Sequence, residues 1–135
     1  MIILSTASTS PCLAQSQGQM NEDAERNLVS ADKKLNSVYN SIIAKNAKNP
    51  LMTAKLKHAQ KAWIDYKDAM IDLQYPVPEH GQTGILYGSA YQMCTAIKAE
   101  SLTKKHTELL SLWLSNPYQE TDVCLGNQSN YYEEE

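Results

Sequence analysis

Aspartates on two predicted helices are the side chains that could most readily do chemistry, since two facing carboxylates can act as general acid and general base. Asp65, Asp68 and Asp72 follow one another along the second predicted helix, next to two lysines. Acidic and basic side chains in such an order are typical of a solvated face with salt bridges. We therefore expect these carboxylates, and Asp32 on the first helix, to lie on the surface and not to form a glycosidase pair.

The other reactive side chains show no pattern of an enzyme active site or a metal site. His58, His80 and His106 lie in three different segments, without HExxH spacing or an i,i+4 partner. No serine or cysteine sits in a GxSxG turn, no GxxxxGK phosphate loop occurs, and no CxxC pair is present. The sequence therefore predicts a protein that is not an enzyme and holds no metal or cofactor.

Eight polar and aromatic residues on two consecutive predicted helices form the most informative pattern. They recur at three- and four-residue steps beside an apolar stripe, which places them along a packed helix face and at its edges. They are Asp32, Asn36 and Tyr39 on the first helix, and Gln60, Trp63, Tyr66, Lys67 and Asp68 on the second. We expect the two sets to face each other in a helical hairpin, where polar groups bond across the pair and fix its register. The alternative is a surface for a ligand or a protein partner.

Apolar residues with helical spacing define the two helices of that hairpin. The first helix is predicted over about residues 21–45 and the second from Pro50 or Leu51 onward, with apolar steps of three and four in both. The Asn49-Pro50 step ends the first segment, and a proline suits the first turn of the next helix. Because only residues 46–49 link the two helices, they must run antiparallel.

A long loop and a third helix complete the predicted fold. Two prolines and three glycines lie between residues 74 and 88, which predicts a loop of about 14 residues. The third helix is predicted from Ser89, as its N-cap, to about Ser115, with Ile97 and Leu109 on its buried side. We therefore expect an all-α fold, an antiparallel three-helix bundle with a long loop between helices two and three.

The charges of the chain are concentrated near its C-terminus. Net charge is −3, but residues 119–135 hold five acidic residues and no basic one, so the rest of the chain is at +2. Such a tail is usually a solvated end, and the alternative is a segment that attracts a cationic partner. Neither part is basic enough to predict nucleic-acid binding.

Tyrosines around the long loop and the last helix end suit a recognition patch. They are Tyr75, Tyr87, Tyr91 and Tyr118.

The N-terminal residues 1–14 have the composition of part of a secretory signal, with a short apolar start, small residues and a possible cut after Ala14. No other stretch approaches the length of a membrane span. The sequence thus divides into a partial signal segment at 1–14, a helical domain at 15–118 and an acidic irregular tail at 119–135.

The cysteines follow from that division. If the chain is cut after Ala14, Cys12 is lost and the simplest disulfide of an exported protein joins Cys94 to Cys124. If Cys12 is retained, a Cys12–Cys94 bridge competes with that pairing.

Several short phrases, in their order along the chain, resemble the LprI-type domain, a family of small exported helical proteins named after a lysozyme inhibitor. The likeness extends over about residues 18–112. The phrases are Met20-Asn21-Glu22, Ala31-Asp32-xx-Leu35-Asn36-xx-Tyr39, Gln60-xx-Trp63-xx-Tyr66-Lys67-Asp68, Cys94 and Thr103-xx-His106-xx-Leu109. The resemblance implies an exported, periplasmic or secreted binding protein without enzymatic activity, whose protein partner is a lysozyme-like cell-wall hydrolase that it inhibits. The alternative is a structural or envelope-stress domain that binds another protein and does not inhibit lysozyme.

The chain departs from the family pattern at four positions. Asp23 stands where the family often has a cysteine, and Ile71 or a neighbour stands at a second such cysteine, so this chain lacks the bridge that those two would form. Lys67 and His106 stand where arginine is usual. Losing a planar guanidinium weakens any inference that these positions bind a carboxylate in a fixed geometry.

Overall fold

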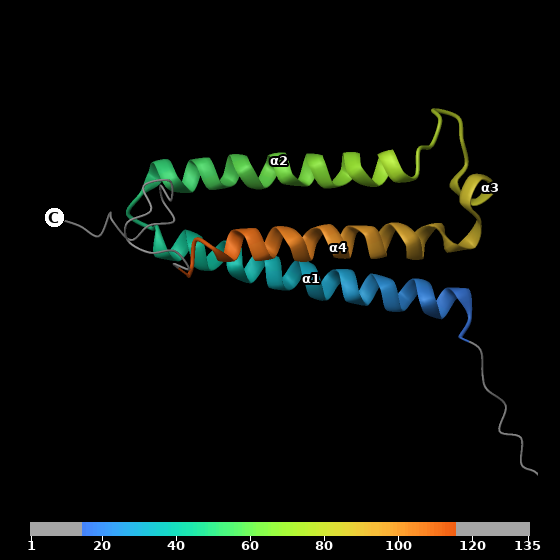
Figure 1. Cartoon of the computed structure of the whole chain (residues 1–135), viewed down its shortest axis with the longest axis horizontal. Helices are drawn as coiled ribbons and strands as arrows, with labels where there is room; N and C mark the ends of the chain where they lie inside the picture. The colour runs from blue at the N-terminus through green and yellow to red at the C-terminus, as the bar shows by residue number, and fades with distance from the viewer. Residues whose placement is uncertain (1–14, 116–135) are drawn as a thin grey trace, which may run out of the picture.

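The computed structural model describes residues 15–115, and this part of the chain is helical without any strand. Its elements are α1 (Gln17–Lys45), α2 (Pro50–Gln74), α3 (Thr83–Tyr87), the 3-10 helix η1 (Gly88–Ala90) and α4 (Tyr91–Ser111). The three long helices lie side by side, and α2 runs opposite to α1 and α4 (Figure 1). This arrangement confirms the predicted all-α bundle of three antiparallel helices with a loop between the second and the third.

Two parts of the sequence prediction fall outside the described range. They are the signal segment at 1–14 and the acidic tail at 119–135. Within residues 15–115, no helix has an apolar stretch long enough to cross a membrane.

Side-chain caps explain where α1 and α2 begin. The Ser16 hydroxyl accepts a hydrogen bond from the Gln19 amide (3.2 Å), and the Gln19 side chain accepts one from the Ser16 amide (3.2 Å). This capping box starts α1 four residues before the predicted position, in a polar turn that the apolar spacing did not reveal. At α2, the Asn49 side chain accepts a hydrogen bond from the Met52 amide (3.0 Å) and Pro50 occupies the first turn, as predicted.

The segment between α2 and α4 differs in part from the prediction. It contains the five-residue helix α3, followed by η1, where the sequence predicted only a loop. Ser89 lies inside η1 and does not cap α4, which begins at Tyr91 without a side-chain cap. Gly88 joins the two short helices with a φ of 71°, a backbone conformation that favours glycine.

The large apolar side chains are buried near the turn between α1 and α2. Ile42 is fully buried, and Leu35 of α1, Met52 and Leu56 of α2 and Leu110 of α4 join it in one cluster. Half-buried side chains surround the cluster, namely Val38, Tyr39, Ile43, Trp63 and Trp113. α2 contributes buried residues only in its first two turns, so the rest of this helix is held less firmly.

Small residues form the seam between α1 and α4, which run in parallel. The buried seam residues are Ala24 and Ala31 on α1 and Ala96, Ala99, Thr103 and Thr107 on α4. Small side chains let two helix backbones approach closely, and α4 is the main neighbour of α1. The predicted burial of Ile97 and Leu109 is therefore wrong, since these residues are 50% and 61% exposed.

Candidate functional site

The residues of the LprI-like phrases meet mainly between α2 and α4. The Trp63 indole of α2 stacks on the His106 imidazole of α4, with 4.3 Å between ring centroids and 5° between ring planes. The His106 Nε2 lies 3.0 Å from the Gln60 Oε1, a distance at which an Nε2–H donates a hydrogen bond. We call Gln60, Trp63 and His106 the α2–α4 clamp. It corrects the prediction that the second-helix set faces the first helix, because its partner is α4.

One ion pair lies next to the clamp. The Lys67 ammonium lies 5.3 Å from the centre of the Trp63 ring and 3.9 Å from the Asp68 carboxylate. Burial lowers the pKa of the His106 imidazole, so the clamp favours the neutral ring. The arrangement is that of a cross-helix contact that fixes the register of α2 on α4.

The other predicted interaction residues are dispersed. Tyr39 packs against the apolar cluster, Asp32 is half-buried on α1, and Asn36, Tyr66 and Asp68 are exposed. Among the carboxylates, Asp65 pairs with Lys61 at 3.1 Å on the exposed face of α2, as expected of a solvated helix face. In residues 15–115, no three His, Cys, Asp or Glu side chains are grouped so that they could hold a metal ion.

A cluster of three tyrosines holds the chain where α2 turns into α3 and α4. Tyr75 meets Tyr87 and Tyr91 edge to face, with centroid distances of 5.6 and 6.1 Å, and Tyr87 stacks on Tyr91 at 5.6 Å. The Tyr87 hydroxyl donates a 2.6 Å hydrogen bond to the Pro76 carbonyl. Burial, with the Cys94 thiol next to it, raises the pKa of the Tyr75 hydroxyl. Three of the four tyrosines proposed as a recognition patch thus come together, while Tyr118 lies outside the described residues.

Aliphatic side chains project to solvent around this tyrosine cluster. Ile85 is 79% exposed and Leu73 is 73% exposed, and Val77 and Leu86 are exposed as well. We call Leu73, Val77, Ile85 and Leu86 the α3 tip. The sequence did not single out these four aliphatic residues, because the Ile85-Leu86 pair lies among glycines that predicted a loop. The only signal was an aliphatic pair without an apolar partner at helical spacing.

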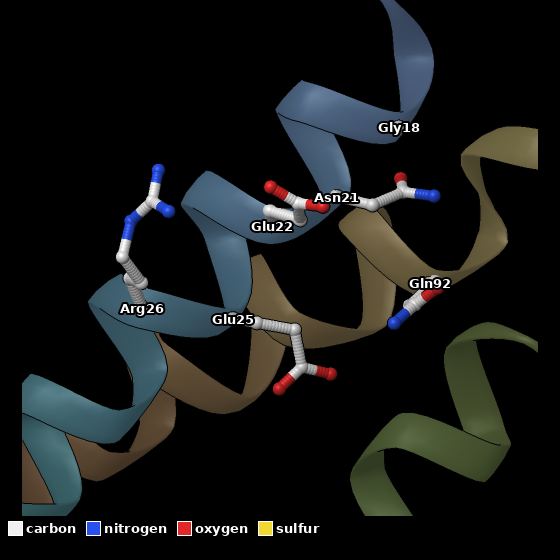
Figure 2. A pocket seen from close by; sticks show the side chains of 6 residues that line it. All are labelled: Gly18, Asn21, Glu22, Glu25, Arg26 and Gln92. Carbon is white, nitrogen blue, oxygen red and sulfur yellow. The ribbon is translucent and has the colours of Figure 1, made fainter.

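A shallow hollow lies at the same end of the bundle, between the beginnings of α1 and α4. It is lined by Gly18, Asn21, Glu22, Glu25, Arg26 and Gln92. Figure 2 shows the two glutamates and Arg26 on α1 and Gln92 on α4. The Asn21 amide donates a 3.3 Å hydrogen bond to the Ser89 carbonyl, and the Gln17 amide donates one to the Met93 sulfur at 3.7 Å, so the beginnings of α1 and α4 are joined here.

Charge is divided along the bundle. The end that carries α3 comprises residues 15–30 and 68–97, with six acidic residues and one basic residue, a net charge of −5. The remaining described residues, 31–67 and 98–115, contain four acidic and eleven basic residues, a net charge of +7. The described part of the chain therefore has an acidic end and a basic end, although its net charge is close to zero.

The predicted disulfide is not visible in the described residues. Cys94 is a free, half-buried thiol on α4. Cys12 and Cys124 both lie outside the described range, so the Cys94–Cys124 pairing remains a prediction.

Comparison with known proteins gives one match. The family model of the lysozyme inhibitor LprI matches residues 10–110, which is most of the chain. No curated protein and no solved structure matches the chain. The matched range includes the whole α2–α4 clamp and the α3 tip. The chain therefore belongs to the LprI lysozyme inhibitor family.

Proposed function

We propose that this protein is an exported binding protein without enzymatic activity that inhibits a lysozyme-like cell-wall hydrolase in the periplasm or outside the cell. The observation that carries this proposal is the match of residues 10–110 to the LprI family model. Family membership supports an inhibitor, and the choice of lysozyme as the target is part of the proposal.

The arrangement of the carboxylates supports binding over catalysis. Hydrolysis of a glycoside needs two carboxyl groups on either side of the scissile bond. Here Asp65 is exposed on α2 and paired with Lys61, whereas Asp32 is half-buried on α1. These positions suit a solvated surface.

The test is a lysozyme activity assay with the purified, oxidised full chain, combined with a direct binding titration against several types of lysozyme. We expect inhibition that saturates and a binding isotherm with the same midpoint. Absence of binding to every lysozyme type would overturn the proposal. It would leave the alternative, a domain that binds another envelope protein, which a pull-down would then have to identify.

A further inference from the structure

We infer that the α3 tip is the surface through which this protein contacts its target, and that the occupant of this surface is the positively charged face of a lysozyme-like hydrolase. The inference rests on the proposed function and adds to it the location of the interface and the chemistry that recognises the partner. Three independent observations support it.

The first observation is the apolar surface itself. Ile85 and Leu73 expose about three-quarters of their surface, at 79% and 73%, and two further aliphatic residues of the tip lie in the same segment. Isolated exposed aliphatic residues are common, but several within 15 residues at one end of a small domain indicate an interaction site. Burying such side chains at the centre of an interface provides much of its binding free energy.

The second observation is that the tip is held in place before any partner binds. The three tyrosines next to it in the chain pack against one another, and Tyr87 donates its hydrogen bond to the Pro76 carbonyl. The Gly81 amide donates a 2.8 Å hydrogen bond to the Pro78 carbonyl, which closes the turn before α3. A Cβ at Gly81 would come within 2.8 Å of the Pro78 ring, so the turn is tightly packed. A surface ordered in advance loses less conformational entropy on binding.

The third observation is the charge around the tip. Between Asp68 and Ile97 the chain has three acidic residues and no lysine or arginine. Glu22 and Glu25 add acidic charge from the start of α1 at the same end, beside the hollow (Figure 2). Lysozymes are typically cationic, and complementary charge both speeds association and excludes wrong orientations. The basic end of the bundle would be repelled by the same partner.

The other candidate surfaces fit less well. The polar groups of the α2–α4 clamp already take part in contacts between the two helices, since Gln60 hydrogen-bonds to His106 and Trp63 stacks on the His106 ring. The exposed leucines at the opposite end, Leu51 and Leu109, lie in the part of the chain with a net charge of +7. The α3 tip, by contrast, combines exposed apolar area with acidic charge.

The experiment compares Ile85→Ser with Leu109→Ser in the full chain. Both substitutions remove an exposed aliphatic side chain from a helix, one at the acidic end and one at the basic end. We expect Ile85→Ser to weaken binding to lysozyme by about tenfold, as truncation of an interface anchor does, and Leu109→Ser to leave the affinity unchanged. Thermal unfolding of both variants should match the parent chain, because neither side chain is buried.

A second measurement maps the interface without mutation. Hydrogen exchange of the complex should slow at amides of residues 73–87 and leave α4 beyond residue 98 unchanged. If the parent chain binds lysozyme while Ile85→Ser keeps full affinity and residues 73–87 show no added protection, the interface lies elsewhere and the proposed function still stands. If the parent chain binds no lysozyme, both the proposed function and this inference are overturned.

Discussion

At the scale of single residues, the clamp shows how residues of one short sequence motif hold α2 on α4. Gln60 and Trp63 lie one helical turn apart on α2, and both reach the same histidine of α4. The ring of His106 therefore has an aromatic neighbour and a hydrogen-bond partner, at the cost of some of its contact with water. Because α2 has only two buried residues, Met52 and Leu56, this contact matters for how the helix is held.

We expect the clamp to make stability depend on pH. Burial lowers the pKa of His106 from its ordinary value of 6.5, so the unfolded chain takes up a proton at a higher pH than the folded chain. The contribution of His106 is fully present above pH 6.5 and is lost as the pH falls through that value and below it. Denaturant unfolding at a series of pH values should show this decline.

The matched pair for this measurement is His106→Gln and His58→Gln. His58 is exposed on the same helix as Trp63, so its replacement is the control for loss of a surface histidine. His106→Gln should flatten the profile between about pH 7.5 and 5.5. An equally steep profile in the His106 variant would show that another group titrates.

A second prediction concerns the fully buried Thr103. Its hydroxyl has no hydrogen-bond partner among the described residues, and leaving a buried hydroxyl unpaired costs about 1–3 kcal/mol. Thr103→Val keeps the shape and removes the hydroxyl, so it should raise the free energy of unfolding by about 1 kcal/mol. Thr107→Val is the control, because the Thr107 hydroxyl donates a 2.8 Å hydrogen bond to the Thr103 carbonyl and its loss should not stabilise. A loss of stability in Thr103→Val would indicate that a water molecule pairs with the hydroxyl.

At the scale of elements, the sequence predicted α1 and α2 well and α4 only in part. Regular apolar steps and the Asn49-Pro50 signal are local properties of the chain, so they located both helices of the hairpin. The buried face of α4 was misjudged because the prediction placed large apolar residues inward, whereas a close parallel neighbour requires small ones. Which helix would face Gln60 and Trp63 depends on packing between distant segments, and spacing within one helix does not contain that information.

The small-residue seam leads to a packing prediction. Ala99 lies buried where α4 meets α1, so Ala99→Leu should overpack the seam and lower the free energy of unfolding by about 1–3 kcal/mol. Ala54→Leu places the same side chain on an exposed position of α2 and should be nearly neutral. Chemical denaturation of both variants makes the comparison, and equal stability would show that the helices can separate without cost.

The position of Cys94 leads to a prediction about disulfides. Gln17 contacts Met93, and Cys12 precedes Gln17 by five residues, a span of at most about 18 Å. Cys124 follows Ser115 by nine residues, at most about 32 Å, while α4 itself extends about 26 Å from Cys94 to Ser111. Pairing with Cys124 therefore requires the chain to return along most of α4.

We expect the oxidised full chain to contain mainly Cys12–Cys94, and a chain cut after Ala14 to contain Cys94–Cys124 or a free Cys94. Mass spectrometry of a non-reduced digest distinguishes the two disulfides and the free thiol. A full chain with mainly a Cys94–Cys124 disulfide would contradict the expectation from these chain lengths. It would favour the pairing that is simplest from the sequence alone.

At the scale of the whole molecule, the separation of charge gives the protein an electric dipole along the bundle. A cationic partner is attracted to the α3 end and repelled from the end where α1 turns into α2. Such a field orients two proteins before they touch, which raises the association rate more than the lifetime of the complex.

Charge reversal at the two ends tests this field. Glu79→Lys lies near the α3 tip and Glu108→Lys near the basic end, and both variants change the net charge by the same amount at an exposed position. At low salt we expect the association rate with lysozyme to fall several-fold for Glu79→Lys and to change little for Glu108→Lys. The difference should fade in about 0.5 M salt because exposed charges are then screened. Equal rates for the two variants would show that net charge, and not its placement, governs the encounter.

The parallel pairing of α1 with α4 also determines when the protein can fold. α1 finds its main neighbour in residues about 70 positions later in the chain, so the seam cannot be completed until nearly all of α4 has been synthesised. Until then α1 and α2 share only the small cluster around Ile42. A growing chain of this kind therefore lacks its main helix–helix contact for most of its synthesis.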